Sequence, residues 1–154
     1  MPYAEHVQGV VGLNYQAESL AARLDLDANT SEVFRSDIHG DPATPVMEAM
    51  LGDTVRIHVL VPFSEQAHVF TLEGHQWPLE PGRLGSDRLS SVQIGGLEAI
   101  TIIPVGGAGG AAALPGDYLY GDHREPYREA GLWGLFRVYA PGDGGSRLRP
   151  LPER

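Results

Sequence analysis

The stretch AHVFTLEGH, residues 67–75, alternates its side chains with the two-residue period of a β-strand. One face of this strand carries His68, Phe70 and Leu72, and the other face carries the residues between them. Phe70 and Leu72 belong in a core, because large apolar side chains are the ones that folding removes from water. His68 is therefore predicted to point toward the protein interior.

A second stretch, GDYLYGDH at residues 116–123, places an acidic residue in the same setting. Its alternation groups Tyr118, Tyr120 and Asp122 on one face, and the two tyrosines make that face the core side. A carboxylate in a core needs a partner, because its desolvation is costly or forces it to take up a proton. We predict a hydrogen bond between the His68 ring and Asp122.

The rest of the chain is typical of short strands separated by turns, since it contains 20 glycines and 12 prolines. In the clearest strand, TVRIHVLVPF at residues 54–63, Ile57, Val59 and Val61 share one face. This pattern favours an all-β sandwich or barrel. Further strands are expected at residues 6–15, 90–95, 99–105 and 132–140, helical turns at 18–25 and 124–131, and a loop at 37–45.

The length of 154 residues suits one domain that buries a core without disulfides or a structural metal. We expect a folded domain over residues 1–140 and a flexible C-terminal tail or linker over residues 141–154. The segment GGAGGAAA, residues 106–113, has almost no side chain to pack and is also expected to be mobile.

Composition excludes several classes of function. A formal charge of -9, with no lysine, argues against a nucleic-acid partner, which needs clustered basic residues. The chain contains no apolar run long enough to cross a bilayer and no signal peptide, so a soluble protein is expected, in a compartment left open. The absence of cysteine removes disulfides, thiolate nucleophiles and thiolate metal ligands.

Two motifs resemble those of the cupredoxin domains of multicopper oxidases, specifically the last domain of the large bacterial enzymes. The family has a strand of the form His-Pro-Phe-His-Leu-His-Gly-His, and HVFTLEGH, residues 68–75, matches it in length. The family's second motif is a Tyr followed by His-Cys-His, three residues, a His, four residues and Met or Leu. Tyr120 with the following GDHREPYREAGLWG keeps that spacing without a gap.

This resemblance spans about residues 52–140 and implies a two-sheet Greek-key β-sandwich of cupredoxin type with short helical turns. It also implies that the blue-copper ligands are largely lost. Of the positions that hold the two histidines, the cysteine and the axial ligand, His68 and the axial-type Leu132 remain, while Asp122 replaces the cysteine and Tyr127 the second histidine. Without a thiolate, no blue-copper site is expected.

The family's oxygen-reducing copper cluster draws four histidines from this domain. Their positions hold Thr71, Glu73, Gly121 and His123, of which one is a histidine. By strand parity these four lie on the outward face, which in the family meets another domain. A complete metal site would therefore need ligands from a partner.

Each group of candidate ligands has a structural interpretation beside the metal one. His68 and Asp122, with Tyr127, form either a buried hydrogen-bonded pair, which we favour, or a mononuclear metal site with nitrogen and oxygen ligands. Glu73 and His123 form either a surface ion pair, which we favour, or part of an inter-domain copper or zinc site.

The leading functional hypothesis is a degenerate cupredoxin domain with a structural or assembly role and no cofactor, whose partners are neighbouring cupredoxin domains or identical subunits. The alternative is a subunit or domain of a copper-dependent oxidoreductase that contributes His123 and Glu73 to an interface copper cluster. A third reading is a small-ligand module built around Trp77. Serine-based hydrolysis has no motif, because Ser64, Ser86, Ser90 and Ser91 lack a nucleophile elbow and sequence alone does not pair the members of a triad.

Overall fold

The computed structural model describes residues 12–24 and 30–142. In chain order the elements are α1 (Leu20–Leu24), η2 (Thr30–Glu32), α2 (Ser36–His39), β1 (Val46–Met50), β2 (Ile57–Val61), β3 (His68–Leu72), β4 (Trp77–Pro78), β5 (Arg88–Leu89), β6 (Ser91–Ile94), β7 (Glu98–Ile102), β8 (Gly116–Asp122), α3 (Glu125–Ala130) and β9 (Trp133–Tyr139).

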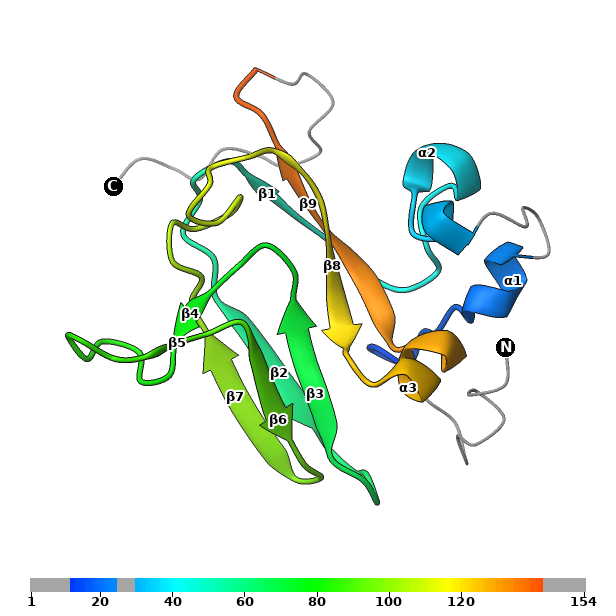
Figure 1. Cartoon of the computed structure of the whole chain (residues 1–154), viewed down its shortest axis with the longest axis horizontal. Coiled ribbons are helices and arrows are strands. Elements are labelled where there is room, and N and C mark those ends of the chain that lie inside the picture. The colour runs from blue at the N-terminus through cyan, green and yellow to red at the C-terminus, as the bar shows by residue number, and fades with distance from the viewer. Residues whose placement is uncertain (1–11, 25–29, 143–154) are drawn as a thin grey trace.

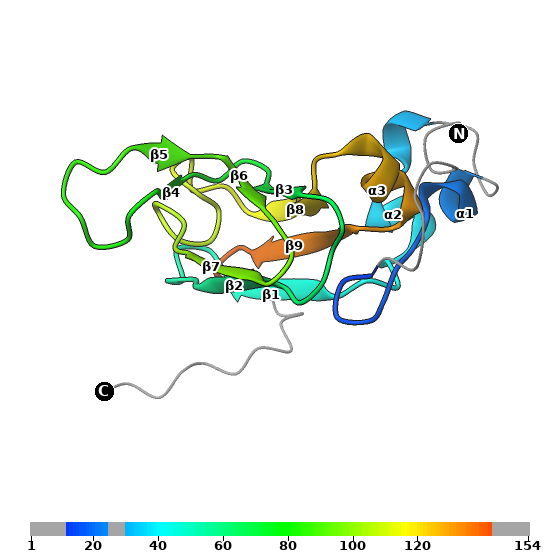
Figure 2. The ribbon, with the colours of Figure 1, turned by 90° about the horizontal axis from the view of Figure 1, so that it is seen from below.

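The strands form two facing layers with a small extra hairpin. The larger sheet has the order β1-β9-β8-β3-β6, and β2 pairs with β7 in the second layer, while β4 and β5 pair separately. The chain passes repeatedly from one layer to the other, and its first and last strands, β1 and β9, lie parallel. Figure 2 shows β2 and β7 as a layer facing β3 and β8. In Figure 1 the three α-helices gather at one end of the sheets.

The main core fills the space between the two layers. Phe70, Leu72, Tyr120 and Phe136 are buried there, contributed by the inner face of the larger sheet. The alternation predicted for residues 67–75 and 116–123 is confirmed by this inner face. Removing these side chains from water supplies the driving force for the sandwich.

The outer face of the larger sheet is partly covered by the N-terminal helices. Leu20 of α1 and Val33 pack there with Trp133 and Leu135 of β9 in a second apolar cluster. Sequence alternation does not reveal this layer, because the helices that cover it are short and distant in sequence from β9.

Arg23 joins this N-terminal layer to the sheet. Its side chain is 2% exposed, forms an ion pair with Glu18, and lies over the Trp133 ring at 4.8 Å. Its guanidinium also donates to the carbonyls of Val33 at 3.2 Å and Gly40 at 3.1 Å. A buried arginine with these partners is fully satisfied, as burial of a cation requires.

The first predicted strand, residues 6–15, is wrong where it is described; its earlier part lies outside the described residues. Leu13 and Gln16 pair across a tight turn, and Asn14 and Tyr15 inside it have φ of 48° and 66°. A strand is incompatible with two successive residues at positive φ.

The premise that residues 106–113 have nothing to pack is also wrong. Ala108 is fully buried in the main core. A Cβ on Gly107 would lie 2.4 Å from the Asp53 carbonyl oxygen, so this glycine allows two backbone segments to meet. The glycines serve close packing, which composition alone does not distinguish from a linker.

The short helices and loops match the predictions in part. The predicted loop at 37–45 overlaps helix α2, and the β4–β5 hairpin was not predicted. The predicted helical turns correspond to α1 and α3, and α3 ends before Gly131, which has φ of 120°. The tail from residue 143 lies outside the described residues.

Within the described ranges, no helix combines the length and apolarity needed to cross a membrane.

Candidate functional site

The predicted pair of His68 and Asp122 is confirmed and lies at one end of the inner face. Phe70 of β3 is opposite Asp122 of β8, which makes His68 the diagonal neighbour of Asp122 on the same face. The His68 Nδ1 atom lies 2.6 Å from Asp122 Oδ2. A carboxylate only accepts hydrogen bonds, so in this pair Nδ1 carries the proton and donates it.

Asp122 is satisfied on both of its oxygens although its side chain is only 3% exposed. The backbone N–H groups of Val69 and Arg124 each donate to Oδ1 at 3.0 Å. The carboxylate therefore links β3, the end of β8 and the start of α3 through three N–H donors. Such an arrangement lets a charged carboxylate stay in the interior.

The other two positions of the blue-copper motif are also brought to His68. The Tyr127 ring meets the His68 ring edge to face with centroids 4.8 Å apart. Tyr127, Leu132, His68 and Asp122 all line one pocket of about 680 Å³. The motif spacing therefore predicted a real cluster in space, although its chemistry differs from that of a copper site.

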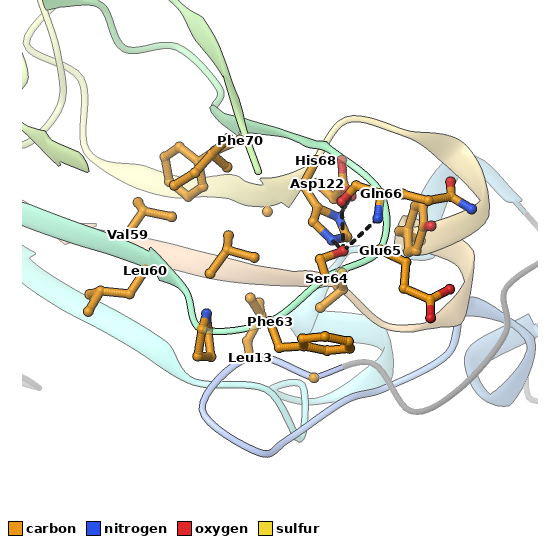
Figure 3. A pocket seen from close by; sticks show the side chains of 17 residues that line it. Leu13, Val59, Leu60, Phe63, Ser64, Glu65, Gln66, His68, Phe70 and Asp122 are labelled. Atoms are coloured by element: carbon orange, nitrogen blue, oxygen red, sulfur yellow. Dashed lines mark hydrogen bonds and ion pairs between the residues drawn. The ribbon is translucent and has the colours of Figure 1, made fainter. Parts of the chain in front are cut away.

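Sequence reasoning missed the second partner of His68. The Ser64 Oγ atom lies 2.8 Å from His68 Nε2 and 2.6 Å from the Gln66 carbonyl oxygen. Figure 3 shows the His68 ring between Asp122 and Ser64 at the pocket wall. Ser64 lies in the loop between β2 and β3, where strand parity makes no prediction. The only signal was its position four residues before His68.

The donor set around His68 does not fit a blue-copper centre. The chain has no cysteine, and both ring nitrogens of His68 are engaged by Asp122 and Ser64. Across the described residues, no group of three or more histidine, cysteine or acidic side chains is arranged to hold a metal ion. Blue copper requires a thiolate in addition to imidazoles, so this cluster is better described as a polar network.

Glu73 and His123 do not form the predicted surface ion pair. The Glu73 N–H donates to the Leu119 carbonyl, and the His123 N–H donates to the Val69 carbonyl. The two residues therefore lie at opposite ends of the β3–β8 pair. Four residues along a strand separate them by roughly 13 Å. The His123 ring instead lies 3.1 Å from the Arg128 guanidinium. The strand register is the physical reason that this pairing fails.

The four positions of the family's copper cluster differ in exposure. Thr71 and Gly121 are buried, whereas Glu73 and His123 are exposed. A Cβ on Gly121 would lie 2.3 Å from the Leu132 carbonyl oxygen, so the chain itself closes over this position. Only Glu73 and His123 are left at the surface that a partner could reach.

Two other polar aromatic groups are inside the sandwich without facing this pocket. His75 is 1% exposed; its Nδ1 lies 2.9 Å from the Glu73 carbonyl, and its Nε2 accepts from the Gly109 N–H at 3.2 Å. Burial raises the pKa of Tyr120 to about 12, and its hydroxyl donates to the Pro45 carbonyl. Trp77 is 2% exposed and packs in the main core, and it is not among the residues that line the pocket beside His68.

Similar folds occur in solved structures of copper proteins. A multicopper oxidase gives a TM-score of 0.50 at 16% identity, over 64% of this chain and 36% of that chain. The copper nitrite reductase of Nitrosomonas europaea gives a TM-score of 0.50 at 20% identity, over 66% and 34%. The multicopper oxidase mgLAC gives 0.50 at 16%, over 69% and 34%. The chain spans about a third of the length of these proteins.

At these identities the comparisons show the fold alone. The predicted all-β sandwich of cupredoxin type is confirmed by the strand arrangement and by these shared folds. No protein-family model matches the sequence, and no curated protein matches it. Fold and site together define a cupredoxin-type domain with a buried, hydrogen-bonded pair of an acid and an imidazole at one end of its sandwich.

Two substitutions of Asp122 separate the roles of its oxygens. Asp122→Ala leaves His68, Val69 and Arg124 with N–H groups that lack their acceptor, and we expect a loss of about 3 kcal/mol in the free energy of unfolding. Asp122→Asn keeps the Oδ1 acceptor and offers an amide to a neutral ring, and we expect a loss of about 1 kcal/mol. Urea unfolding of both variants measures the difference, and equal losses would contradict the network.

Proposed function

We propose that this chain is a degenerate cupredoxin domain that carries no blue-copper centre and serves as a structural or assembly module. The observation that carries the proposal is the buried hydrogen bond between His68 and Asp122 at the motif positions of a copper histidine and cysteine. The buried Asp122 carboxylate needs no metal ion to stabilise it, because three N–H donors already satisfy its oxygens.

The alternative is a domain that supplies Glu73 and His123 to a copper cluster at an interface. Both side chains are exposed, which such a site needs, but the Arg128 guanidinium beside the His123 ring opposes a divalent cation. The two side chains are also too far apart along the strands to bind one ion. We therefore rank this alternative second.

Titration of the purified chain with copper(II) and with zinc(II) distinguishes these functions. We expect calorimetry to show no stoichiometric site with a Kd tighter than about 10 µM, which corresponds to about 7 kcal/mol. Tight binding that disappears in His123→Ala would support the interface cluster. Tight binding that disappears in His68→Ala would show that the metal displaces the buried pair, and it would overturn the proposal.

Restoring the lost ligands tests whether the scaffold still has copper-site geometry. In the double variant Asp122→Cys with Tyr127→His, the thiolate would take the N–H donors of Val69 and Arg124, and the new imidazole would face His68. We expect copper(II) to give an intense visible absorption band. The single variant Tyr127→His is the control and should stay colourless. A colourless double variant that is folded would contradict the inherited geometry.

We extend the proposal to a partner, an identical subunit or a neighbouring domain of the same type. The support is a group of exposed apolar side chains at one end of the β2–β7 layer: Leu60 is 66%, Phe63 79% and Leu97 87% exposed. The Leu97 N–H donates to the Val61 carbonyl at 2.7 Å, which keeps these residues together. Large exposed apolar side chains near one another on a strand layer favour association.

Light scattering of the chain over a range of concentrations tests for an identical partner. We expect mass to increase with concentration in the parent chain and to stay monomeric in Leu60→Ser with Leu97→Ser, because the double variant removes the apolar surface. Leu84→Ser is the matched control, since Leu84 is 99% exposed in the β4–β5 connection. A parent chain that is monomeric throughout would exclude self-association through this surface.

A further inference from the structure

Ser64, His68 and Asp122 are connected by hydrogen bonds in the order found in serine hydrolases. Ser64 Oγ lies 2.8 Å from His68 Nε2, and His68 Nδ1 lies 2.6 Å from Asp122 Oδ2 (Figure 3). We propose that these three residues form a catalytic triad that hydrolyses small neutral esters through an acyl intermediate on Ser64. This activity goes beyond the structural role proposed above and uses the same buried pair.

The protonation pattern of the ring suits this role. Asp122 accepts the Nδ1 proton and is itself held by two backbone N–H groups, so the tautomer with a free Nε2 acceptor is favoured. Nε2 is the atom that faces Ser64 Oγ. His68 is therefore positioned as the general base for the serine hydroxyl, and Asp122 is a positioning residue.

The loop around Ser64 is fixed by contacts on both sides. Arg124 donates to the Ala67 carbonyl at 2.5 Å and to Gln66 Oε1 at 2.9 Å. On the other side, a Cβ on Gly96 would lie 2.7 Å from the Ser64 carbonyl oxygen, so the two backbones are in close contact. A nucleophile held by such a loop loses little entropy on reaching its reactive geometry.

Backbone groups of the same loop can stabilise charge near Ser64. The Gln66 N–H donates to Ser64 Oγ at 3.2 Å, which favours negative charge on that oxygen. Within the described residues the N–H of Glu65, the residue after the nucleophile, has no acceptor, and we assign it to a substrate oxyanion. The Gln66 carbonyl, at 2.6 Å from Oγ, competes for the serine proton in the resting state.

The pocket beside Ser64 sets the substrate class. Its volume of about 680 Å³ is in the range of small-molecule sites, and Leu13, Phe63 and Leu132 contribute apolar walls. Asp122 and Glu65 lie at the same pocket, and the chain carries a formal charge of -9. These charges oppose anionic ligands, so a neutral ester with a short apolar acyl group is the chemistry that fits.

The reaction balances without a cofactor. Ser64 Oγ forms a bond to the ester carbonyl carbon while its proton passes to His68 Nε2. Collapse of the tetrahedral intermediate breaks the bond to the leaving alkoxide, which takes the proton from Nε2 and departs as the alcohol. Water then attacks the acyl carbon, gives a proton to Nε2, and releases the carboxylic acid as Ser64 Oγ recovers the proton.

Labelling with an alkyl fluorophosphonate tests the nucleophile directly. Attack by Ser64 forms an oxygen–phosphorus bond, expels fluoride, and gives a mass increase on the peptide that contains Ser64. We expect labelling of the folded parent chain, none of Ser64→Ala, and a rate at least about 100-fold lower in His68→Ala, the loss typical of a general base. Labelling must persist in a metal chelator, which separates the triad from any metal-dependent hydrolysis.

Ser86→Ala is the matched control for this experiment. Ser86 Oγ accepts the Glu80 N–H at 2.9 Å and donates to the Asp87 carbonyl at 3.3 Å, so it has a similar backbone setting without an imidazole. This variant should label at the parent rate. Labelling that survives Ser64→Ala, or a folded parent chain that reacts no faster than the urea-denatured chain, would overturn the triad.

Asp122→Asn tests the positioning role separately from folding. The amide N–H₂ would donate to Nδ1, which moves the ring proton to Nε2 and leaves no ring nitrogen to accept the Ser64 proton. We expect the long-range ¹H–¹⁵N spectrum of His68 to report this change of tautomer together with at least about 100-fold slower labelling. An unchanged labelling rate with the tautomer switched would contradict the triad. Hydrolysis of p-nitrophenyl butyrate, measured in parallel, should slow in Asp122→Asn by a similar factor. In Ser64→Ala it should fall to the background rate.

Discussion

The buried carboxylate of Asp122 is the constraint on which this end of the sandwich depends. It is taken out of water between two strands and a helix, and it accepts N–H groups from His68, Val69 and Arg124. A charge in such a place is tolerated only when its acceptor capacity is used by donors in fixed positions. The register of β3 against β8 and the first turn of α3 are therefore coupled through one side chain.

The sandwich itself does not rely on this network for most of its burial. The apolar residues between the layers and the second cluster under the N-terminal helices are separate from the polar end. A cupredoxin-type fold can thus keep its strands while the side chains at these positions vary, since His68 and Asp122 lie at strand ends and Tyr127 lies in α3. A shared fold with copper proteins consequently says little about metal content, and the side chains at those positions decide it.

Strand alternation predicts which side chains share a face of the sheet, but it does not predict contacts made by loops or by layers packed on that face. Strand parity correctly predicted that His68 and Asp122 share an interior face, and the motif spacing placed Tyr127 beside them. Parity did not predict that Thr71 is buried, because it describes one strand and not the packing on its outer face. It was also silent on the Ser64 contact, which is set by a loop conformation and by the guanidinium of Arg124, the residue before α3.

A position that suits a metal-binding imidazole also suits a general base. In both cases an imidazole must be held in one tautomer and one orientation with a ring nitrogen directed at an open pocket. When the group beside the ring is a carboxylate, the ring donates to it through Nδ1, and Nε2 becomes the free acceptor. Any hydroxyl that a neighbouring loop brings to Nε2 then completes a relay, and in this chain the tight packing of Gly96 against Ser64 holds that loop in place. Acid–base chemistry at this site would therefore follow from the geometry of the fold together with the carboxylate at position 122.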